Sequence, residues 1–253
     1  MIQKFKANLA ALRQEISIPE YILWWAIRIC MFLYIKKELR PDRDIIDYVL
    51  PFLITAGTCA VFLIRMIFPK KTLLGRISYK AQKYISFMIF FGTFIGNYFG
   101  LYGVNGETGA IHYDWILHAI SGVTITMLGY HLLVAMNGDK TKLTPQISAC
   151  GSIGFSCLVI VAWEIMEFCG DFGWGDDNQK YDWVVQEFDP FYPLLSKTAV
   201  GPEQYGVYDT NIDMAFAFFV TIITAVVLYI VLKRREKKAA AVPAETEPAV
   251  ISA

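Results

Sequence analysis

The 253-residue sequence lacks the motifs that would assign it to a common class of soluble enzyme. Its five cysteines form no CxxC pair, and they lie in or at the ends of apolar stretches, so neither a disulfide framework nor a cysteine-based zinc site is expected. A serine nucleophile elbow, a phosphate-binding P-loop and a dinucleotide-binding glycine motif are absent in usable context. The formal net charge is +0, so the charge balance indicates no nucleic-acid partner.

The sequence is rich in long hydrophobic segments. Hydrophobic residues make up 55% of the chain, and the mean hydropathy is +0.42, which is too apolar for an ordinary soluble domain. We therefore expect an all-α, polytopic transmembrane bundle, formed as a single domain over residues 18–232. Its six expected spans, most of them near the roughly 20 residues that cross a bilayer, are residues 18–35, 45–68, 84–101, 114–136, 147–169 and 212–232.

The segments on either side of this domain differ from it in composition. Residues 1–17 predict a short amphipathic helix on the inner membrane surface, with apolar side chains from Ile2, Phe5 and Leu9 on one face. Residues 233–253 are basic and then rich in Ala, Pro and Glu, which predicts a membrane-anchoring charge cluster followed by a disordered cytoplasmic tail.

The distribution of basic residues predicts the orientation. Lys and Arg are concentrated in the segments that would be cytoplasmic if the N-terminus were inside, which favours cytoplasmic placement of both termini in a bacterial cell membrane. The loop after the first span argues mildly against this orientation, because it contains Lys36, Lys37, Arg40 and Arg43.

Acidic residues and one histidine lie at one end of each of the last three expected spans. Within each span they recur at helical spacing, so they share a face. Because successive spans run in opposite directions, the three ends should reach the same, outer side. Ionisable groups within membrane spans are costly and usually mark function. We therefore predict one outer-facing site that contains Asp114, His118, Glu164, Glu167, Asp171, Asp209 and Asp213.

The residue types at this site favour a divalent metal ion, whose identity they leave open. Carboxylates with one imidazole suit Mg²⁺, Mn²⁺, Ca²⁺, zinc or iron. Glu167 or Asp171 would then act as general base. A proton-sharing or ion-conducting set of carboxylates is the alternative. The metal ligands expected from the sequence are Asp114, His118, Glu164, Asp209 and Asp213.

Helix capping is a simpler explanation for part of this set. An Asp at a helix N-terminus bonds free N–H groups and suits the helix dipole, which could account for Asp114 and Asp209. Capping does not account for Glu164 and Glu167, which we expect near a helix C-terminus, where the dipole disfavours negative charge.

The segment 170–208 is the one long loop expected on the outer side, and it is rich in aromatic and acidic residues. An apolar stripe that includes Tyr181, Val184 and Phe188 predicts an interfacial helix. Such a loop could close over the site as a lid, or it could be an ordinary aromatic belt at the membrane surface.

Three motifs carry a family resemblance: Tyr113-Asp114 with His118, Trp163-Glu164 with Glu167, and Tyr208-Asp209 with Asp213. In this order they resemble the uncharacterised YjdF-like bacterial membrane proteins and, more remotely, the VanZ-like family. The resemblance covers the last four expected spans. It implies a function at the cell envelope, since VanZ-like members are associated with glycopeptide tolerance, and it implies no particular reaction.

Two classes of function remain open from the sequence. The first is a metal-dependent hydrolase or transferase that acts at the membrane surface on a lipid-linked or headgroup substrate. The second is a cation- or proton-binding, transporter-like protein, or a non-enzymatic membrane protein that confers envelope tolerance. Membrane lipids are the only partners that the sequence indicates.

The predicted topology can be tested with reporter fusions. A reporter that works only in the cytoplasm should be active when it is fused after residue 241. A reporter that works only outside the cytoplasm should be active when it is inserted between residues 175 and 200. The reversed pattern would contradict the orientation and the outward placement of the acidic site.

Overall fold

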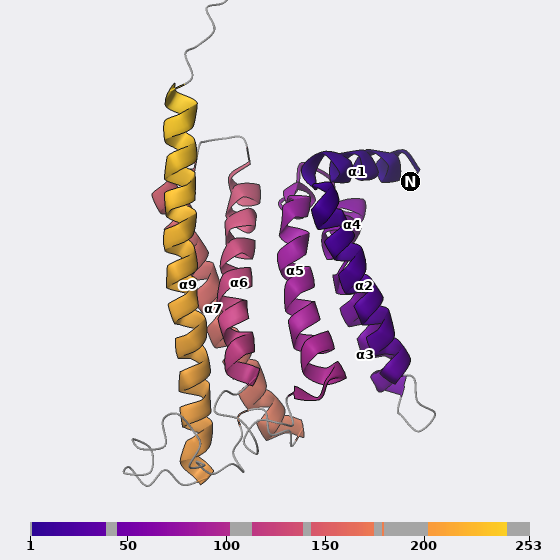
Figure 1. The fold of residues 1–253 in the computed structure, drawn as a ribbon, viewed down its shortest axis with the longest axis vertical. Helices are drawn as coiled ribbons and strands as arrows, with labels where there is room; N and C mark the ends of the chain where they lie inside the picture. The colour runs from indigo at the N-terminus through magenta and orange to yellow at the C-terminus, as the bar shows by residue number, and fades with distance from the viewer. Residues whose placement is uncertain are drawn as a thin grey trace, which may run out of the picture.

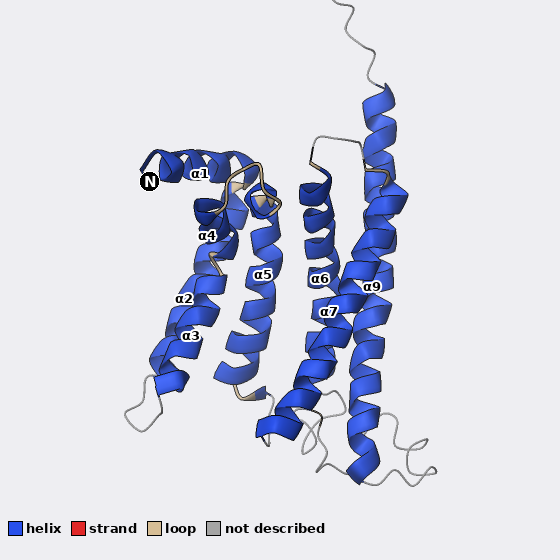
Figure 2. Cartoon of the chain, turned by 180° about the vertical axis from the view of Figure 1, so that it is seen from behind, coloured by secondary structure: helices blue, strands red, loops and turns tan. Residues whose placement is uncertain are grey.

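The computed structural model describes residues 2–38, 45–101, 113–138, 143–174, 179 and 202–241, and its regular elements in these ranges are all helical (Figure 2). The all-α prediction is therefore confirmed. The expected interfacial helix near Tyr181 lies outside the described residues. The expected tail is described as far as Ala241, where it continues the last helix, and residues 242–253 lie outside the described residues. The elements are α1 (Ile2–Glu15), α2 (Ile18–Glu38), α3 (Ile45–Gly57), α4 (Ala60–Ile67), η1 (Leu74–Arg76), η2 (Tyr79–Ala81), α5 (Gln82–Ile89), the π-helix η3 (Phe90–Tyr98), α6 (Tyr113–Asn137), α7 (Pro145–Trp174) and α9 (Pro202–Ala241).

Four of these helices are long and apolar enough to cross a membrane: α2, α6, α7 and α9. The other two expected spans are each divided between two elements. Residues 45–68 form α3 and α4, separated by a turn, and residues 84–101 pass from α5 into the π-helix η3. The structure thus supports a membrane protein with four candidate spanning helices among the described residues, and it does not confirm the six spans that hydropathy predicts.

Side chains from neighbouring helices bond the backbone where α3 and α4 separate. Gln82 on α5 donates to the carbonyl of Gly57 at 3.0 Å and accepts from the N–H of Val61 at 2.7 Å. Arg28 on α2 donates to the carbonyl of Thr58 at 3.0 Å. An interrupted helix at membrane depth is tolerated when its backbone groups are bonded inside the protein. Arg28 therefore supports the neighbouring broken helix.

Helix α1 lies across the ends of the neighbouring N-terminal helices, transverse to α2 (Figure 1). It is held there by polar contacts with α4 and η2. Glu15 accepts from Arg65 Nη1, Ser78 Oγ and the N–H of Tyr79, each at 2.8 Å, and buried Asn8 donates to the carbonyl of Arg65 at 3.1 Å.

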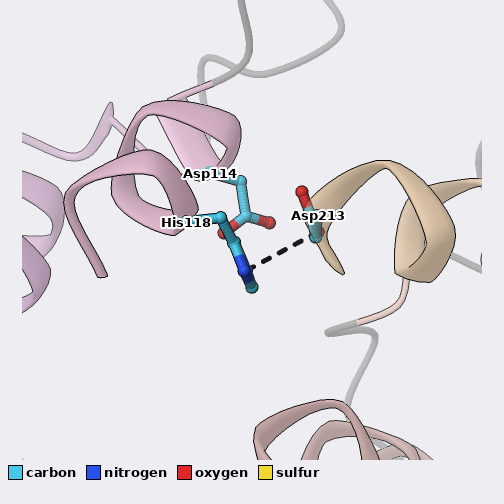
Figure 3. Close-up of side chains that lie close together, drawn as sticks. All are labelled: Asp114, His118 and Asp213. Atoms are coloured by element: carbon cyan, nitrogen blue, oxygen red, sulfur yellow. Dashed lines mark ion pairs between the residues drawn. The ribbon is translucent and has the colours of Figure 1, made fainter. Parts of the chain in front are cut away.

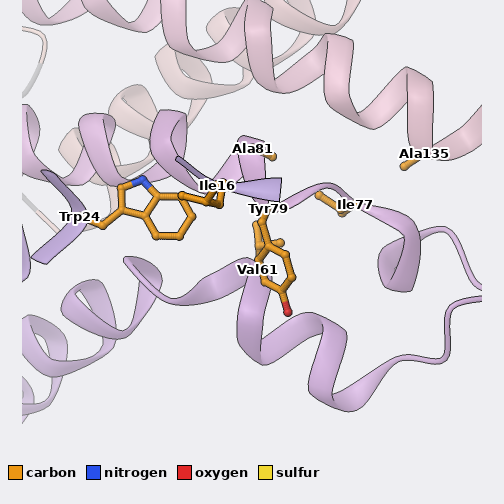
Figure 4. Close-up of a cluster of buried hydrophobic side chains, with 7 residues drawn as sticks. All are labelled: Ile16, Trp24, Val61, Ile77, Tyr79, Ala81 and Ala135. Carbon is orange, nitrogen blue, oxygen red and sulfur yellow. The ribbon is translucent and has the colours of Figure 1, made fainter. Parts of the chain in front are cut away.

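A hydrophobic cluster connects the N-terminal helices to the end of α6 (Figure 4). It brings together residues from the α1–α2 junction, α4, the η1–η2 segment and the end of α6. The buried members are Ile16, Trp24, Val61, Ile77, Tyr79, Ala81 and Ala135.

Helices α6, α7 and α9 form a closely packed bundle in the C-terminal half (Figure 1). Its interior contains small and hydroxyl-bearing residues, among them the fully buried Thr126, Ser156 and Thr221. The hydroxyls of Ser156 and Thr221 are 2.9 Å apart, and Thr126 donates to the carbonyl of Gly122 on its own helix at 2.6 Å. Small residues allow helix backbones to approach closely in a membrane, where apolar burial gives little driving force for association.

Gly122 shows how close α6 and α9 are. A Cβ atom at this position would lie 2.5 Å from the carbonyl oxygen of Ala217 and 3.0 Å from Cβ of Val220, so a larger residue would force the two helices apart.

We predict that Gly122→Ala lowers the free energy of unfolding by about 1–3 kcal/mol, the usual cost of overpacking a dense interior. The matched control is Gly154→Ala on α7, where a Cβ would meet nothing within 4 Å. It should be neutral or slightly stabilising, since Ala is the better helix former. Thermal unfolding of both variants in detergent measures the difference, and equal stability of the two would contradict the close α6–α9 approach.

The contacts of Glu15 predict a pH dependence. Burial alone would raise the pKa of Glu15, but hydrogen bonds from Arg65, Ser78 and Tyr79, with the charge of Arg65, lower this pKa below its ordinary value. A carboxyl with a lowered folded-state pKa stabilises the protein above its unfolded-state pKa, near 4.3. That stabilisation is lost as the pH falls through the folded-state pKa.

The difference in melting temperature between wild type and Glu15→Gln should therefore be constant from pH 7 to about 5 and shrink below about pH 4.3. Glu236→Gln, which alters an exposed carboxylate on α9, is the control and should change the melting temperature little. A difference for Glu15→Gln that is the same at pH 7 and pH 3 would show that its ionisation is not coupled to folding.

Candidate acidic-histidine site

The start of α6, the end of α7 and the start of α9 meet at one end of the molecule, opposite to α1 and to the C-terminal end of α9 (Figure 1). His118 lies at the centre of the polar residues there, and its side chain is buried. Its Nε2 is 3.7 Å from Asp114 Oδ1 and 3.7 Å from Asp213 Oδ2 (Figure 3). The site therefore joins two residues of one helix to a third from a helix far away in the sequence.

Glu164 on α7 lies on the other side of the same imidazole. Its Oε1 is 3.7 Å from His118 Nδ1, and its side chain is buried. The ring is thus placed between the carboxylate of α7 at Nδ1 and the carboxylates of α6 and α9 at Nε2. Glu164 belongs to the same cluster as Asp114, His118 and Asp213, but it faces a different nitrogen.

The helix bounds change the explanation for two of the acids. Helix α9 begins at Pro202, about two turns before Asp209, so Asp209 and Asp213 both lie inside the helix. Capping therefore does not explain Asp209, which is buried at 3% exposure. The sequence predicted that Glu164 and Glu167 lie near the C-terminus of their helix. Helix α7 continues to Trp174, so both residues lie about two turns or more before that end.

Glu167 and Asp171 contact groups outside the His118 cluster. Glu167 Oε1 accepts from the indole N–H of Trp163 at 2.6 Å on an exposed part of α7. Asp171 Oδ2 accepts from the backbone N–H of Gln179 at 2.9 Å. Both carboxylates lie within about two turns of Glu164 on the same helix.

Gln179 was not identified from the sequence. It is buried, and its Nε2 donates to the carbonyl of Glu164 at 3.3 Å and to Thr210 Oγ1 at 2.9 Å, so it links α7 to α9 beside the site. A single glutamine in a loop belongs to no helical pattern, and no signal in the sequence indicated this role.

A groove between α7 and α9 reaches the cluster from the outside of the bundle. It has a volume of ≈ 420 Å³, and Glu164, Gln179 and Thr210 are among its polar lining residues. A second hollow of ≈ 330 Å³ shares Val161, Asn211 and Met214 with the first and continues along the same two helices to Phe218. The apolar side chains along this path include exposed Phe168 and Phe218.

Buried hydroxyls continue from the site into the bundle. Ser121 donates to the carbonyl of His118 at 2.7 Å, and Ser152 donates to the carbonyl of Ser148 at 2.6 Å. These hydrogen bonds lie within single helices, so they account for the hydroxyls as parts of a packed interior.

Residues 21–234 match the family described as "Predicted membrane protein (DUF2238)". A search of curated proteins gave no match. A search of solved structures also gave none.

Proposed function

This chain belongs to the family of predicted membrane proteins (DUF2238), and we propose that it holds a divalent metal ion with Asp114, His118 and Asp213. One observation carries the proposal. Each of these residues offers one ligand atom, these atoms lie within 4.8 Å of one another, and His118 and Asp213 are buried. A buried group of two carboxylates and one imidazole is a donor set that divalent metals accept.

The distances fit such an ion. Two ligands that are each about 2.0–2.2 Å from a tetrahedral zinc ion stand about 3.3–3.6 Å apart. The separations of 3.7 Å from His118 Nε2 to Asp114 and to Asp213 are close to this value. Larger ions with longer ligand bonds accept wider separations, so the geometry favours no single metal.

Glu164 has a different role in this proposal from the one expected from the sequence. Ligating histidines usually donate their second ring N–H to a carboxylate or carbonyl, which fixes the ring and raises its basicity. Glu164 faces Nδ1 while the proposed ligands face Nε2. We therefore assign Glu164 as the residue that orients His118. Ligation by Asp209 and general-base roles for Glu167 or Asp171 stay predictions.

The groove between α7 and α9 supports a lipid or envelope-lipid substrate. Its polar end includes Glu164, and its apolar length faces the side of the bundle that lipid would cover. When bound, the ion would polarise a phosphoryl or carbonyl oxygen of a substrate headgroup. The chain's own residues would place the acyl part along α7 and α9 and its headgroup beside Glu164. This arrangement supports hydrolysis or group transfer at the outer membrane surface.

Handling of cations or protons is the second candidate, favoured by the buried hydroxyls that continue inward from His118. Ser121, Thr126 and Ser152 donate to carbonyls of their own helices, and Ser156 pairs with Thr221 between α7 and α9. Hydroxyls that are bonded in this way favour packing over conduction. We therefore place the metal-dependent enzyme first.

Metal analysis of protein purified without chelator tests the proposal. Wild type should contain a divalent metal. Free metal at a concentration of about 100 times its dissociation constant should raise the free energy of unfolding by about 2.7 kcal/mol. Asp213→Asn and His118→Ala should lose the metal, whereas Glu164→Gln should weaken binding by about 10- to 100-fold. His131→Gln, which changes a histidine near the other end of α6, is the matched control and should retain it.

Two results would reject the metal assignment. One is wild-type protein without metal whose melting temperature is unchanged by Mn²⁺, Mg²⁺, Zn²⁺, Ca²⁺ or chelator. The other is equal metal content in wild type and Asp213→Asn. If metal binds, the protein should then be incubated with a bacterial lipid extract and the lipid species followed by mass spectrometry. New species formed by wild type and absent with His118→Ala would support the enzyme over the transporter.

A further inference from the structure

The corner between α1 and α2 contains a cavity of ≈ 330 Å³. The chain turns here from a helix that lies across the bundle into the first spanning helix (Figure 1). The corner therefore lies at the depth where lipid headgroups meet acyl chains. Its lining residues are Leu9, Leu12, Arg13, Ile16, Ser17, Ile18 and Tyr21.

Several contacts hold the corner in place. The N–H and hydroxyl of Ser17 donate to Glu20 Oε2 at 3.1 and 2.9 Å, which fixes the first turn of α2. On the other side, Lys4 Nζ and Asn8 Nδ2 donate to the carbonyls of Ile67 and Arg65 at 3.2 and 3.1 Å, which fixes α1 against the end of α4. A ligand would consequently meet a cavity whose walls are already positioned.

The charge at this corner is positive. Glu15 is the only acid of α1 and is paired with Arg65 at 2.8 Å, and Glu20 in the first turn of α2 is paired with Lys83 at 3.3 Å. Arg13 is exposed and lines the cavity. Since the two nearby acids already face cations, Arg13 gives the cavity a net attraction for an anion.

The apolar surface continues from the cavity along α2 in the direction of the membrane interior. Ile18, Tyr21 and Ile22 are exposed by 77%, 43% and 63%. A ligand that fits this surface has a negative group beside Arg13 and a long apolar part along α2.

We propose that this corner binds an anionic phospholipid of the leaflet on the side of the termini. The phosphate lies beside Arg13, and the acyl chains follow Ile18, Tyr21 and Ile22. The site is formed by α1 and α2 alone and does not depend on the metal site of α6, α7 and α9.

Native mass spectrometry of the full-length protein, titrated with dioleoyl phosphatidylglycerol or dioleoyl phosphatidylcholine, tests this proposal. Wild type should retain phosphatidylglycerol in preference to phosphatidylcholine. Arg13→Gln should reduce this preference about fivefold, the effect of one basic residue at an anionic membrane surface. Arg13→Lys should preserve most of it, because the charge remains.

Lys6→Gln is the matched control, since it removes one positive charge from an exposed position of α1 that does not line the cavity. It should keep the wild-type preference within about twofold, a change smaller than the one-charge effect. Equal losses for Lys6→Gln and Arg13→Gln, or no preference in wild type, would overturn the site. A change of oligomeric state with Arg13→Gln at unchanged lipid binding would also overturn it and would assign the corner to a contact between copies of the chain.

Discussion

The close approach of α6 and α9 at Gly122 is the constraint on which the candidate site depends. Gly122 lies one turn from His118, and Ala217, whose carbonyl a Cβ at Gly122 would strike at 2.5 Å, lies one turn from Asp213. The distance between the backbones of α6 and α9 at Gly122 therefore determines how far His118 is from Asp213, one helical turn away. The hydroxyl pair of Ser156 and Thr221 brings α7 to the same bundle at 2.9 Å. Glu164 follows Ser156 by about two turns, so α7 presents it to the other ring nitrogen of His118.

The two halves of the molecule use polar residues for different purposes. In the N-terminal half, Arg28 and Gln82 bond backbone groups where α3 and α4 separate, so their position within the helices is explained by the fold itself. In the C-terminal half, α6, α7 and α9 are unbroken helices over the site. Their carboxylates gather around a side chain, the imidazole of His118, at 3.7 Å. Ionisable residues that converge in this way inside a membrane usually mark a functional site.

Helical spacing in the sequence was sufficient to predict an all-α protein and to place Asp114, His118, Glu164 and Asp213 at one end of the last helices. The spacing of the polar residues specifies the helix face on which they lie. The alternating direction of successive spans specifies the side of the membrane that they reach, so both could be predicted from the sequence. Hydropathy could not predict the break at Thr58, because it reports apolar composition and contains no information on hydrogen-bond register. The last expected span, residues 212–232, is shorter than helix α9, which runs from Pro202 to Ala241, because an apolar window ends where polar residues begin even when the helix continues. The contacts of Gln179 depend on tertiary structure alone.

The two ring nitrogens of His118 face different carboxylates, and this asymmetry relates the groove to the proposed metal site. Glu164 lines the groove between α7 and α9 and also lies 3.7 Å from Nδ1, whereas Asp114 and Asp213 lie at Nε2. A headgroup in the groove would change the surroundings of Glu164, and Glu164 would transmit that change to His118 through the ring. Electron donation from a carboxylate at one ring nitrogen strengthens the other nitrogen as a ligand. Under the proposed function, binding in the groove and metal affinity are therefore coupled through one imidazole, and each should change the other by the same factor.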